Sequence, residues 1–221
     1  MANNMDIRSA YVARHPTLEE IASELKSYLN DALEGEQRID MIATRAKDIA
    51  GFVKKANNPK KNYQNPINEI QDQVGARIVV HLQSDVDHIA HKMKSEFTFI
   101  EVQEKKQSDP KAFDYQARHM ICHLPPQIIN KHNSLISLFE LQICTLFQHA
   151  WAEVSHDLAY KPNHEIPEEI TRKIALIAAQ AWGADLMFQT IWNELEQPGP
   201  TQGIEDKVEN TDNKHSSSSP S

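Results

Sequence analysis

The sequence lacks the features that define several large classes of protein. Only 2 of its 221 residues are cysteine, Cys122 and Cys144, and they do not form a CxxC pair. This argues against a disulfide framework and against a structural zinc site. No apolar run approaches the roughly 20 residues that a membrane-spanning helix needs. The first residues also lack the apolar stretch of a signal peptide. We therefore predict a cytoplasmic protein with no membrane partner.

Two further absences concern the binding of nucleotides and nucleic acids. Neither GxxxxGKS/T nor GxGxxG occurs, which disfavours the common folds that hold phosphates in a glycine-rich loop. The formal net charge is −8, which argues against a surface that binds nucleic acid throughout. A local basic patch remains compatible with this balance.

The chain is long enough for one sizeable core and not comfortably for two. Helical spacing of apolar residues predicts helices over 17–33, 39–55, 85–97, 146–160 and 168–196. β-Branched or alternating runs predict strands over 76–82, 98–102, 115–124 and 138–145. This order predicts one α+β domain over residues 1–197. The Pro-, Gly- and Ser-rich segment 198–221 is predicted to be a disordered tail.

The predicted strand 138–145 has one polar face. Alternate side chains of a strand point to opposite sides, so Glu140, Gln142 and Cys144 share one face, whereas Leu141 and Ile143 share the other. A solvated sheet face is the commoner explanation of such a pattern. The alternative is a functional site that contains Glu140.

A second carboxylate, Asp72, precedes the predicted strand 76–82, and Gly75 lies between them. Glycine permits a close approach of the backbone at that point. Two carboxylates near the ends of strands in one sheet can hold Mg²⁺, which takes its other ligands from water and substrate phosphates. Because acidic residues near strand ends are common, Asp72 and Glu140 alone do not establish a metal site.

Basic residues are concentrated between positions 41 and 61, where Asp48 is the single acid. They are Arg45, Lys47, Lys54, Lys55, Lys60 and Lys61. A triphosphate needs such a concentration of cationic donors. A solvated helix face explains the same residues equally well.

Three other features have weaker functional interpretations. Tyr115 could stack on a nucleobase, although a half-buried strand tyrosine is the commoner case. Cys144 has no neighbouring base and is interpreted as a structural thiol. One face of the predicted helix 146–160 carries residues that could bind zinc, but no sequence spacing identifies the further ligands that a zinc site needs. The residues of that face are His149, Glu153, His156 and Tyr160.

The segment 139–161, FELQICTLFQHAWAEVSHDLAYK, resembles the signature of the RelA/SpoT-homologue synthetase domain. In that signature, ExQxRT leads into a helix that begins near HAWAE and ends in HDxxYK. Three more segments resemble motifs of the same family in the same order. They are RAKDIAGFVKK, similar to a helix of that family, DQVGARIVV and DYQARH. The chain is most similar to the single-domain small alarmone synthetases and their toxin relatives.

The resemblance implies a mixed β-sheet of nucleotidyltransferase type surrounded by helices. It also implies a Mg²⁺-dependent transfer of the β,γ-pyrophosphate of ATP to the 3′-hydroxyl of GDP or GTP, which gives (p)ppGpp. Matched residue by residue, Glu140 is the catalytic base, and Asp72 with Glu140 holds the metal. The ATP-binding positions are Arg45, Lys47, Lys55 and Arg77. The acceptor-binding positions are Tyr115, His119, Gln142 and His149.

The chain departs from the family pattern mainly on the acceptor side. Cys144 stands where the family has arginine, and Asp114 and Gln116 replace a glycine and a frequent arginine. Two alternatives therefore stay open. One is a toxin-like pyrophosphokinase that modifies the tRNA 3′ end or adenosine nucleotides, and the other is a catalytically silent nucleotide-binding module.

The predicted helix 168–196 has a long apolar stripe that suits either a core or an interface. Its members are Ile170, Ile174, Ile177, Ala181, Ala184, Phe188, Ile191 and Leu195. Small synthetases of this type often assemble through terminal helices, so the resemblance leaves a homo-oligomer open, and an antitoxin partner is left open as well. Both kinds of partner are compatible with this sequence.

Overall fold

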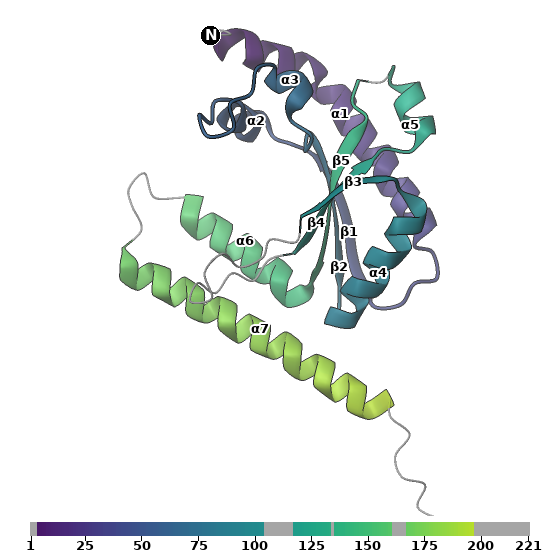
Figure 1. The fold of residues 1–221 in the computed structure, drawn as a ribbon, viewed down its shortest axis with the longest axis vertical. Helices are drawn as coiled ribbons and strands as arrows, with labels where there is room; N and C mark the ends of the chain where they lie inside the picture. The colour runs from purple at the N-terminus through teal and green to yellow at the C-terminus, as the bar shows by residue number, and fades with distance from the viewer. Residues whose placement is uncertain (1–3, 104–116, 134, 161–166, 197–221) are drawn as a thin grey trace, which may run out of the picture.

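The computed structural model describes residues 4–103, 117–133, 135–160 and 167–196 (Figure 1). Tyr115 and the segment 198–221 lie outside these ranges, so their predicted roles stay predictions. The helices are α1 (Asn4–Ala32), α2 (Ile49–Ala56), α3 (Pro66–Glu69), α4 (Gln83–Glu96), α5 (Pro126–Lys131), α6 (Leu146–Tyr160) and α7 (Glu168–Glu196). The strands are β1 (Ile39–Ala46), β2 (Val74–Val80), β3 (Phe99–Gln103), β4 (Arg118–His123) and β5 (Leu138–Thr145).

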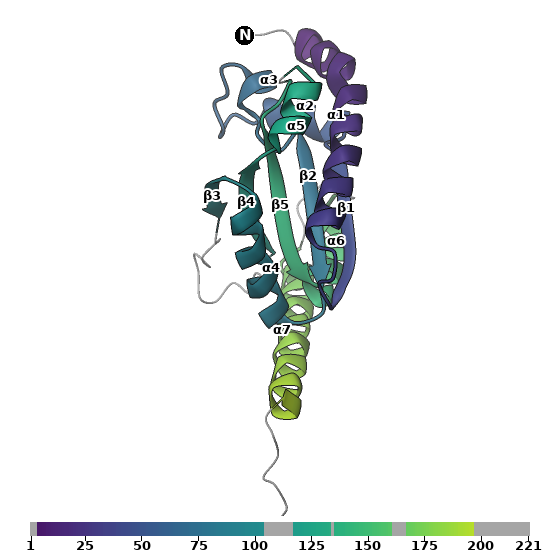
Figure 2. The same cartoon turned by 90° about the vertical axis from the view of Figure 1, so that its right-hand side faces the viewer.

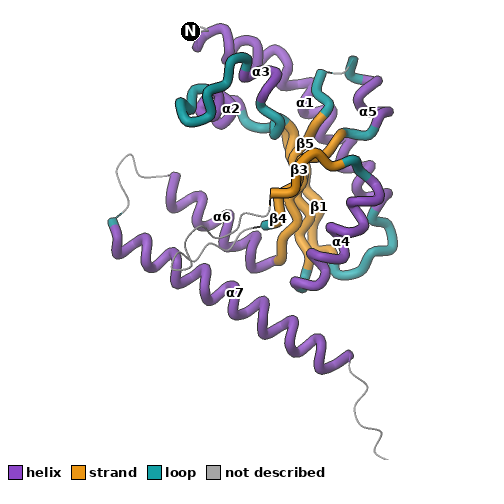
Figure 3. Tube along the Cα trace, viewed as in Figure 1, coloured by secondary structure: helices purple, strands orange, loops and turns teal. Residues whose placement is uncertain are grey.

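The five strands form one mixed sheet in the order β1-β2-β5-β4-β3. The central pair, β2 and β5, is parallel, and every other pair is antiparallel. Figure 3 shows the strands as one layer with helices on both sides. The α+β class and the mixed sheet predicted from the sequence are therefore confirmed.

One face of the sheet forms the core with α1 and α4. Ile78 of β2 and Leu141 of β5 are fully buried there, as are Leu25 and Leu29 of α1. The alternation predicted for 138–145 produces this arrangement, because Leu141 and Ile143 point into the core while Glu140 and Gln142 remain half-buried on the opposite face. The core thus fixes which side of the sheet carries the polar residues.

The helix predicted over 39–55 is wrong over its first half and confirmed from Ile49 onward. Residues 39–46 form the edge strand β1, antiparallel to β2, and the helix α2 begins only at Ile49. Ile39 and Ile42 pack on the core, and their spacing fits a helix as well as an irregular edge strand. Asp48 then starts α2 by accepting a hydrogen bond from the Gly51 backbone at 2.7 Å. Arg45 consequently lies on a strand, not on the helix that the family resemblance implied.

The N-terminal helix is longer than the segment 17–33 predicted from its spacing. It begins at Asn4 and contains Pro16, which should end a helix. Tertiary contacts explain the difference, because Tyr11 in the early turns is fully buried. Its ring stacks on Phe52 of α2 with the centroids 3.7 Å apart. Packing against α2 thus outweighs the cost of the internal proline.

The junction between β5 and α6 is held by a capping box. The Gln148 backbone donates to Thr145 Oγ1 at 3.1 Å, and the Thr145 backbone donates to Gln148 Oε1 at 2.9 Å. The bounds predicted for β5, α6 and α7 agree with the structure. The short helix α5 was not predicted, because Pro125 and Pro126 read as the end of a strand, whereas Pro126 occupies the first helical position.

The last helix, α7, packs beside α6 and runs past the end of the sheet (Figures 1 and 2). It is long and apolar enough to cross a membrane by length and composition alone. Its buried residue Asp185 accepts a hydrogen bond from the Thr145 hydroxyl, so one polar contact ties α7 to the end of β5. Burial raises the pKa of Asp185 to about 7.

This buried carboxyl predicts a pH-dependent stability. Between about pH 4 and pH 7, Asp185 keeps its proton in the folded protein but loses it in the unfolded chain. The free energy of unfolding therefore falls as the pH rises through this range. The variant Asp185→Asn does not titrate. The free energy of unfolding of the variant, relative to that of wild type, should therefore rise by on the order of 2 kcal/mol between pH 5 and pH 8. Urea unfolding at both pH values measures this, with exposed Glu194→Gln as the control. If Asp185→Asn and wild type differ in their free energy of unfolding by the same amount at both pH values, the pKa of Asp185 is not raised.

Candidate active site

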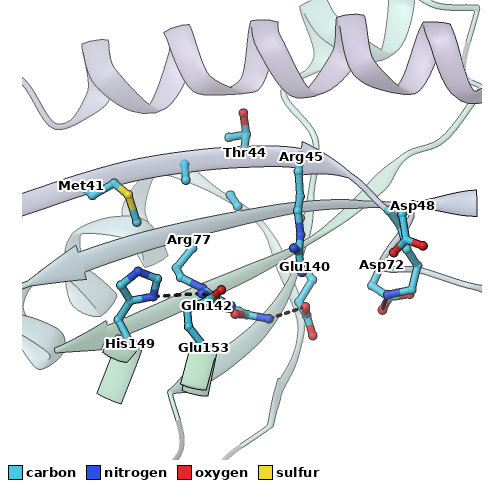
Figure 4. A pocket seen from close by; sticks show the side chains of 14 residues that line it. Met41, Thr44, Arg45, Asp48, Asp72, Arg77, Glu140, Gln142, His149 and Glu153 are labelled. Atoms are coloured by element: carbon cyan, nitrogen blue, oxygen red, sulfur yellow. Dashed lines mark hydrogen bonds and ion pairs between the residues drawn. The ribbon is translucent and has the colours of Figure 1, made fainter. Parts of the chain in front are cut away.

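A pocket of about 250 Å³ lies over the polar face of β1, β2 and β5. It is lined by Met41, Ala43, Thr44, Arg45, Lys47, Asp48, Asp72, Gly75, Ala76, Arg77, Glu140, Gln142, His149 and Glu153. Figure 4 shows Arg77, Gln142, His149 and Glu153 gathered at one end and Asp72 near the other, with Glu140 between them. Glu140 therefore lies between a polar cluster around Arg77 and the second carboxylate, Asp72.

Glu140 is held by two neighbours on the sheet. His119 Nδ1 of β4 lies 3.1 Å from Glu140 Oε1, and Gln142 Nε2 donates to Oε2 at 2.7 Å. Burial alone would raise the pKa of Glu140, but the hydrogen bond and charge of His119, with the Gln142 hydrogen bond, outweigh it and leave the pKa below its ordinary value. Glu140 is therefore ionised at neutral pH and oriented into the pocket.

Asp72 is neutralised on one side only. The ammonium groups of Lys47 and Lys55 lie 2.9 Å and 2.8 Å from the same oxygen, Oδ2. Burial would raise the pKa of Asp72, but the charge of Lys47 and the hydrogen bonds from both lysines keep it below its ordinary value. The other oxygen, Oδ1, is buried and has no hydrogen-bond partner among the described residues. A buried carboxylate oxygen without a partner is a ready ligand for a cation.

The two carboxylates fit a magnesium site better than a zinc site. Glu140 pairs in register with Gly75, close to Asp72, and the charge of Asp72 acts on the pKa of Glu140. Within the described ranges, no three His, Cys, Asp or Glu side chains form a group that could hold a metal. Mg²⁺ can be coordinated by one or two protein carboxylates when phosphates and water supply its other ligands, whereas zinc needs at least three protein ligands.

The absence of a side chain at Gly75 keeps this part of the pocket clear. A Cβ atom there would lie 4.0 Å from the Glu140 carbonyl oxygen and would meet nothing closer. The space above Gly75 is bordered by the carboxylates of Asp72 and Glu140. The glycine thus leaves room for a bound group between the two acids.

Arg77 connects β2, β5 and α6 at the other end of the pocket. Its Nε donates to Gln142 Oε1 at 3.1 Å, and its Nη1 lies 3.0 Å from His149 Nδ1. The same nitrogen forms an ion pair with Glu153. The Arg77 hydrogen bond lowers the pKa of Glu153. This network fixes the guanidinium group in the pocket wall.

The structure brings most of the predicted site residues together. Asp72, Glu140, Arg45, Lys47, Arg77, Gln142 and His149 line the pocket. Lys55 reaches Asp72 from α2, and His119 reaches Glu140 from β4. Tyr115 lies outside the described residues. Cys144 is buried, and burial raises its pKa to about 11, which agrees with a structural thiol.

Sequence reasoning missed two residues that support this site. Glu153 was considered only as part of a zinc-like stripe, although its spacing of one helical turn from His149 places both on the same face of α6. Tyr11 was not considered at all. Its hydroxyl donates to the Lys47 carbonyl oxygen at 2.8 Å, a contact between distant segments that no local pattern indicates.

Comparison with known proteins agrees with this geometry. A family model described as "Region found in RelA / SpoT proteins" matches residues 44–165, more than half of the chain. The chain belongs to the RelA/SpoT family. The matched region contains β2, β5 and α6 together with all the pocket residues except Met41 and Ala43.

Two proteins of Bacillus subtilis (strain 168) are similar to this chain. The chain is 25% identical to GTP pyrophosphokinase YjbM over 184 residues, which cover 81% of this chain and 85% of YjbM. It is 24% identical to GTP pyrophosphokinase YwaC over 170 residues, which cover 74% of this chain and 79% of YwaC.

Solved structures show the same fold. Small alarmone synthetase 1 from Bacillus subtilis superposes with a TM-score of 0.70 at 23% identity, over 86% of this chain and 100% of that one. The same enzyme bound to its product pppGpp gives a TM-score of 0.67 at 24% identity, over 86% of this chain and 97% of that one.

The Tyr11 contact predicts a measurable contribution to stability. Burial, with the charges of Asp72 and Asp48, raises the pKa of Tyr11 well above its ordinary value, so the hydroxyl is a neutral donor. Tyr11→Phe keeps the ring stacked on Phe52 but removes the donor to Lys47. Urea unfolding should show a loss of about 1 kcal/mol.

The matched control is Tyr28→Phe, because the Tyr28 ring packs on Phe97 in the same core. We expect this control to change the free energy of unfolding by less than about 0.5 kcal/mol. Equal losses in the two variants would show that the Tyr11 hydroxyl has no special role.

Proposed function

We propose that the protein is a Mg²⁺-dependent pyrophosphokinase that transfers the β,γ-pyrophosphate of ATP to the 3′-hydroxyl of GDP or GTP, which makes (p)ppGpp. The observation that carries this proposal is the pair of carboxylates, Asp72 and Glu140, in a pocket that also holds Arg45, Lys47 and Arg77. The names of the two Bacillus relatives, both GTP pyrophosphokinases, support the same reaction.

The basic residues suit the binding of ATP. Arg45 is exposed on β1 and lines the pocket, so it can contact a phosphate without breaking a buried interaction. Lys47 and Lys55 converge on Asp72 and would share their charge with phosphate oxygens once a cation occupies Asp72 Oδ1. Arg77 is held through Nε and Nη1 by Gln142, His149 and Glu153, and it would donate to a phosphate through Nη2.

Asp72 and Glu140 would hold a divalent cation, and Mg²⁺ is the ion that this oxygen donor set prefers. When bound, Mg²⁺ neutralises charge on the transferred phosphates. The protein would supply the remaining effects through positioning and fixed charge.

Glu140 is the proposed general base. Its carboxylate is ionised at neutral pH and is oriented by His119 and Gln142. It would take the proton of the acceptor 3′-hydroxyl while that oxygen attacks the β-phosphorus of ATP. The bond from the β-phosphorus to the α,β-bridging oxygen breaks, and AMP leaves. His119, Gln142 and His149, with Tyr115, would line the acceptor side.

A second candidate is the tRNA 3′ end, or an adenosine nucleotide, as acceptor. Cys144 favours it, because this buried side chain provides no charge at the position where the family resemblance expects an arginine for phosphate. A silent binding module is disfavoured because both carboxylates and their orienting partners are present. We also propose that the protein is cytoplasmic and has one synthetase domain over residues 1–197. Its partner would be further copies of itself or an antitoxin.

One assay separates these possibilities. The full chain is incubated with γ-labelled ATP, Mg²⁺ and, separately, GDP, GTP, AMP or deacylated tRNA. We expect label in the guanosine nucleotides. Label in tRNA or AMP alone would show that one of these molecules, and not GDP or GTP, is the acceptor. No transfer to any acceptor would contradict the proposal.

In the same assay, Glu140→Gln tests the base. We expect a loss of about 10²- to 10⁴-fold in kcat, because the amide cannot accept the proton. Binding of ATP should change much less than kcat, because Asp72 and the basic residues remain. Exposed Glu96→Gln at the end of α4 is the matched control and should keep its full rate. Undiminished turnover in Glu140→Gln would remove Glu140 from the mechanism.

A further inference from the structure

The part of the pocket around Asp72 is built by two segments that lie just beyond the strands. Lys47 follows β1, and Asp72 with Gln73 precedes β2. The register of these antiparallel strands ends with Ala46 opposite Val74. One more backbone hydrogen bond, from Lys47 N to Gln73 O at 2.8 Å, extends the pairing. Past this point the chain leaves the sheet on both sides, so the sheet alone does not fix how Lys47 lies against Asp72.

One face of α1 reaches both segments. It carries Tyr11, Arg14 and His15, named here the α1 clamp, whose spacing of three and four residues places their side chains together on a helix. Figure 1 shows the first half of α1 beside α2, which follows β1, and α3, which precedes β2. The α1 clamp therefore faces the segment that carries Lys47 and the segment that carries Asp72.

The α1 clamp holds the backbone of Lys47 with two donors. Tyr11 Oη donates to the Lys47 carbonyl oxygen at 2.8 Å, and His15 Nε2 lies 3.2 Å from the same oxygen. A carbonyl oxygen only accepts hydrogen bonds, so Nε2 of His15 carries the ring proton. The other end of Lys47 is held as well, because its ammonium group lies 2.9 Å from Asp72 Oδ2. A movement of the Lys47 backbone would therefore disturb this ion pair.

Tyr11 also supports the second lysine of this site. Its ring stacks on Phe52 of α2 with the centroids 3.7 Å apart. Lys55, about one turn further along α2, lies 2.8 Å from Asp72 Oδ2. Both lysines that neutralise Asp72 are therefore connected to one tyrosine of α1.

Arg14 holds the segment that carries Asp72. Its Nη1 donates to the Ile67 carbonyl oxygen at 3.0 Å and to Gln73 Oε1 at 3.2 Å. Gln73 is buried, and its Nε2 donates to the carbonyl oxygens of Ile67 and Ile70 at 2.8 Å and 3.0 Å. These hydrogen bonds close the loop in which Asp72 lies, and Arg14 ties the loop to α1.

The α1 clamp lies in the part of α1 that contributes fewer residues to the core. Most of the core residues of this helix, among them Leu18, Leu25 and Leu29, come after Pro16. Pro16 has no backbone N–H to donate to the preceding turn, so the first turns are joined less firmly to the rest of the helix. The hydrogen bonds of the α1 clamp described above all end on the two segments of the pocket.

We propose that the three residues of the α1 clamp are positioning residues for the cation and ATP. By holding Lys47, Lys55 and the loop of Asp72, they keep both ammonium groups on Asp72 Oδ2. Asp72 Oδ1, buried and without a partner among the described residues, then stays available to the cation. Groups that orient a metal ligand in this way affect the affinity for the metal. This role rests on the proposed function, because it requires that the cation and ATP occupy this pocket.

The first test measures the Mn²⁺ affinity of the full chain with a non-hydrolysable ATP analogue, by electron paramagnetic resonance, and the Mg²⁺ dependence of pyrophosphate transfer. Arg14→Gln should weaken Mn²⁺ binding and raise the half-saturating Mg²⁺ concentration, each about tenfold. At saturating Mg²⁺, kcat should fall by less than about threefold, because Arg14 contacts no reacting group. A merely structural defect would reduce the amount of active protein and leave the half-saturating Mg²⁺ concentration unchanged.

Two further variants of α1 accompany this test. Arg8→Gln, exposed on the same helix, is the matched control and should bind Mn²⁺ as wild type does. Arg14→Lys should restore most of the affinity, because one ammonium group can donate to both acceptors of Arg14 Nη1. A loss in Arg14→Lys equal to that in Arg14→Gln would contradict the role of these hydrogen bonds.

Tyr11→Phe tests the same claim by a smaller change, and circular dichroism confirms that each variant is folded. The variant keeps the ring on Phe52 but removes the donor to Lys47. Mn²⁺ affinity should fall several-fold in Tyr11→Phe and stay at the wild-type value in Tyr28→Phe.

The second test asks whether Arg14 acts through Asp72. When Arg14→Gln is added to Asp72→Asn, Mn²⁺ binding should weaken no further, because the effects of residues that act through one another do not add. A further loss as large as that in the wild-type background would overturn the proposed role.

These readouts separate the α1 clamp from the proposed function. If wild type binds Mn²⁺ with the analogue but transfers no pyrophosphate, the proposed function fails, while the Mn²⁺ affinities still decide on the α1 clamp. Wild-type Mn²⁺ affinity in both Arg14→Gln and Tyr11→Phe would overturn the role of the α1 clamp and leave the proposed function intact. Absence of Mn²⁺ binding in wild type would contradict both.

Discussion

The parallel pairing of β2 with β5 is the constraint on which the site depends. Because the two strands run in the same direction and Gly75 stands opposite Glu140, the acid just before β2 and the acid early in β5 arrive at the same end of the sheet. The other elements then act on these two acids. The segment from β1 to α2 brings Lys47 and Lys55 to Asp72, and β4 brings His119 to Glu140.

The charges in this pocket are balanced differently at the two acids. Glu140 is ionised because neutral or weakly basic groups donate to it, and it stays available to accept a proton. Asp72 is ionised because two ammonium groups share one of its oxygens, which leaves the other oxygen buried and without a partner among the described residues. Glu140 is thus placed to accept a proton as well as to bind a cation, whereas Asp72 has the environment of a metal ligand alone.

The sequence predicted the elements whose patterns are unambiguous. Alternation in β5 and the long helical spacing of α7 gave correct bounds, and the polar face of β5 pointed to Glu140 and Gln142 before any contact was known. The edge strand β1 was missed because Ile39 and Ile42 fit both periodicities and pairing with β2 decides between them. The contacts of Tyr11 and Glu153 join segments far apart in the chain, so no local pattern could reveal them. The stripe on α7 suited either a core or an interface, and the spacing alone could not show that the buried residues of this helix are Ala178 and Asp185 beside it.

The central claim is that Asp72 and Glu140 together hold a divalent cation with ATP. Electron paramagnetic resonance of Mn²⁺, titrated into the full chain with a non-hydrolysable ATP analogue, measures this directly. Asp72→Asn should weaken Mn²⁺ binding by at least about tenfold, because it removes one of the two carboxylates. The exposed control Asp31→Asn on α1 should bind as wild type does. Equal Mn²⁺ affinity in Asp72→Asn and wild type would show that Asp72 is not a ligand of the cation.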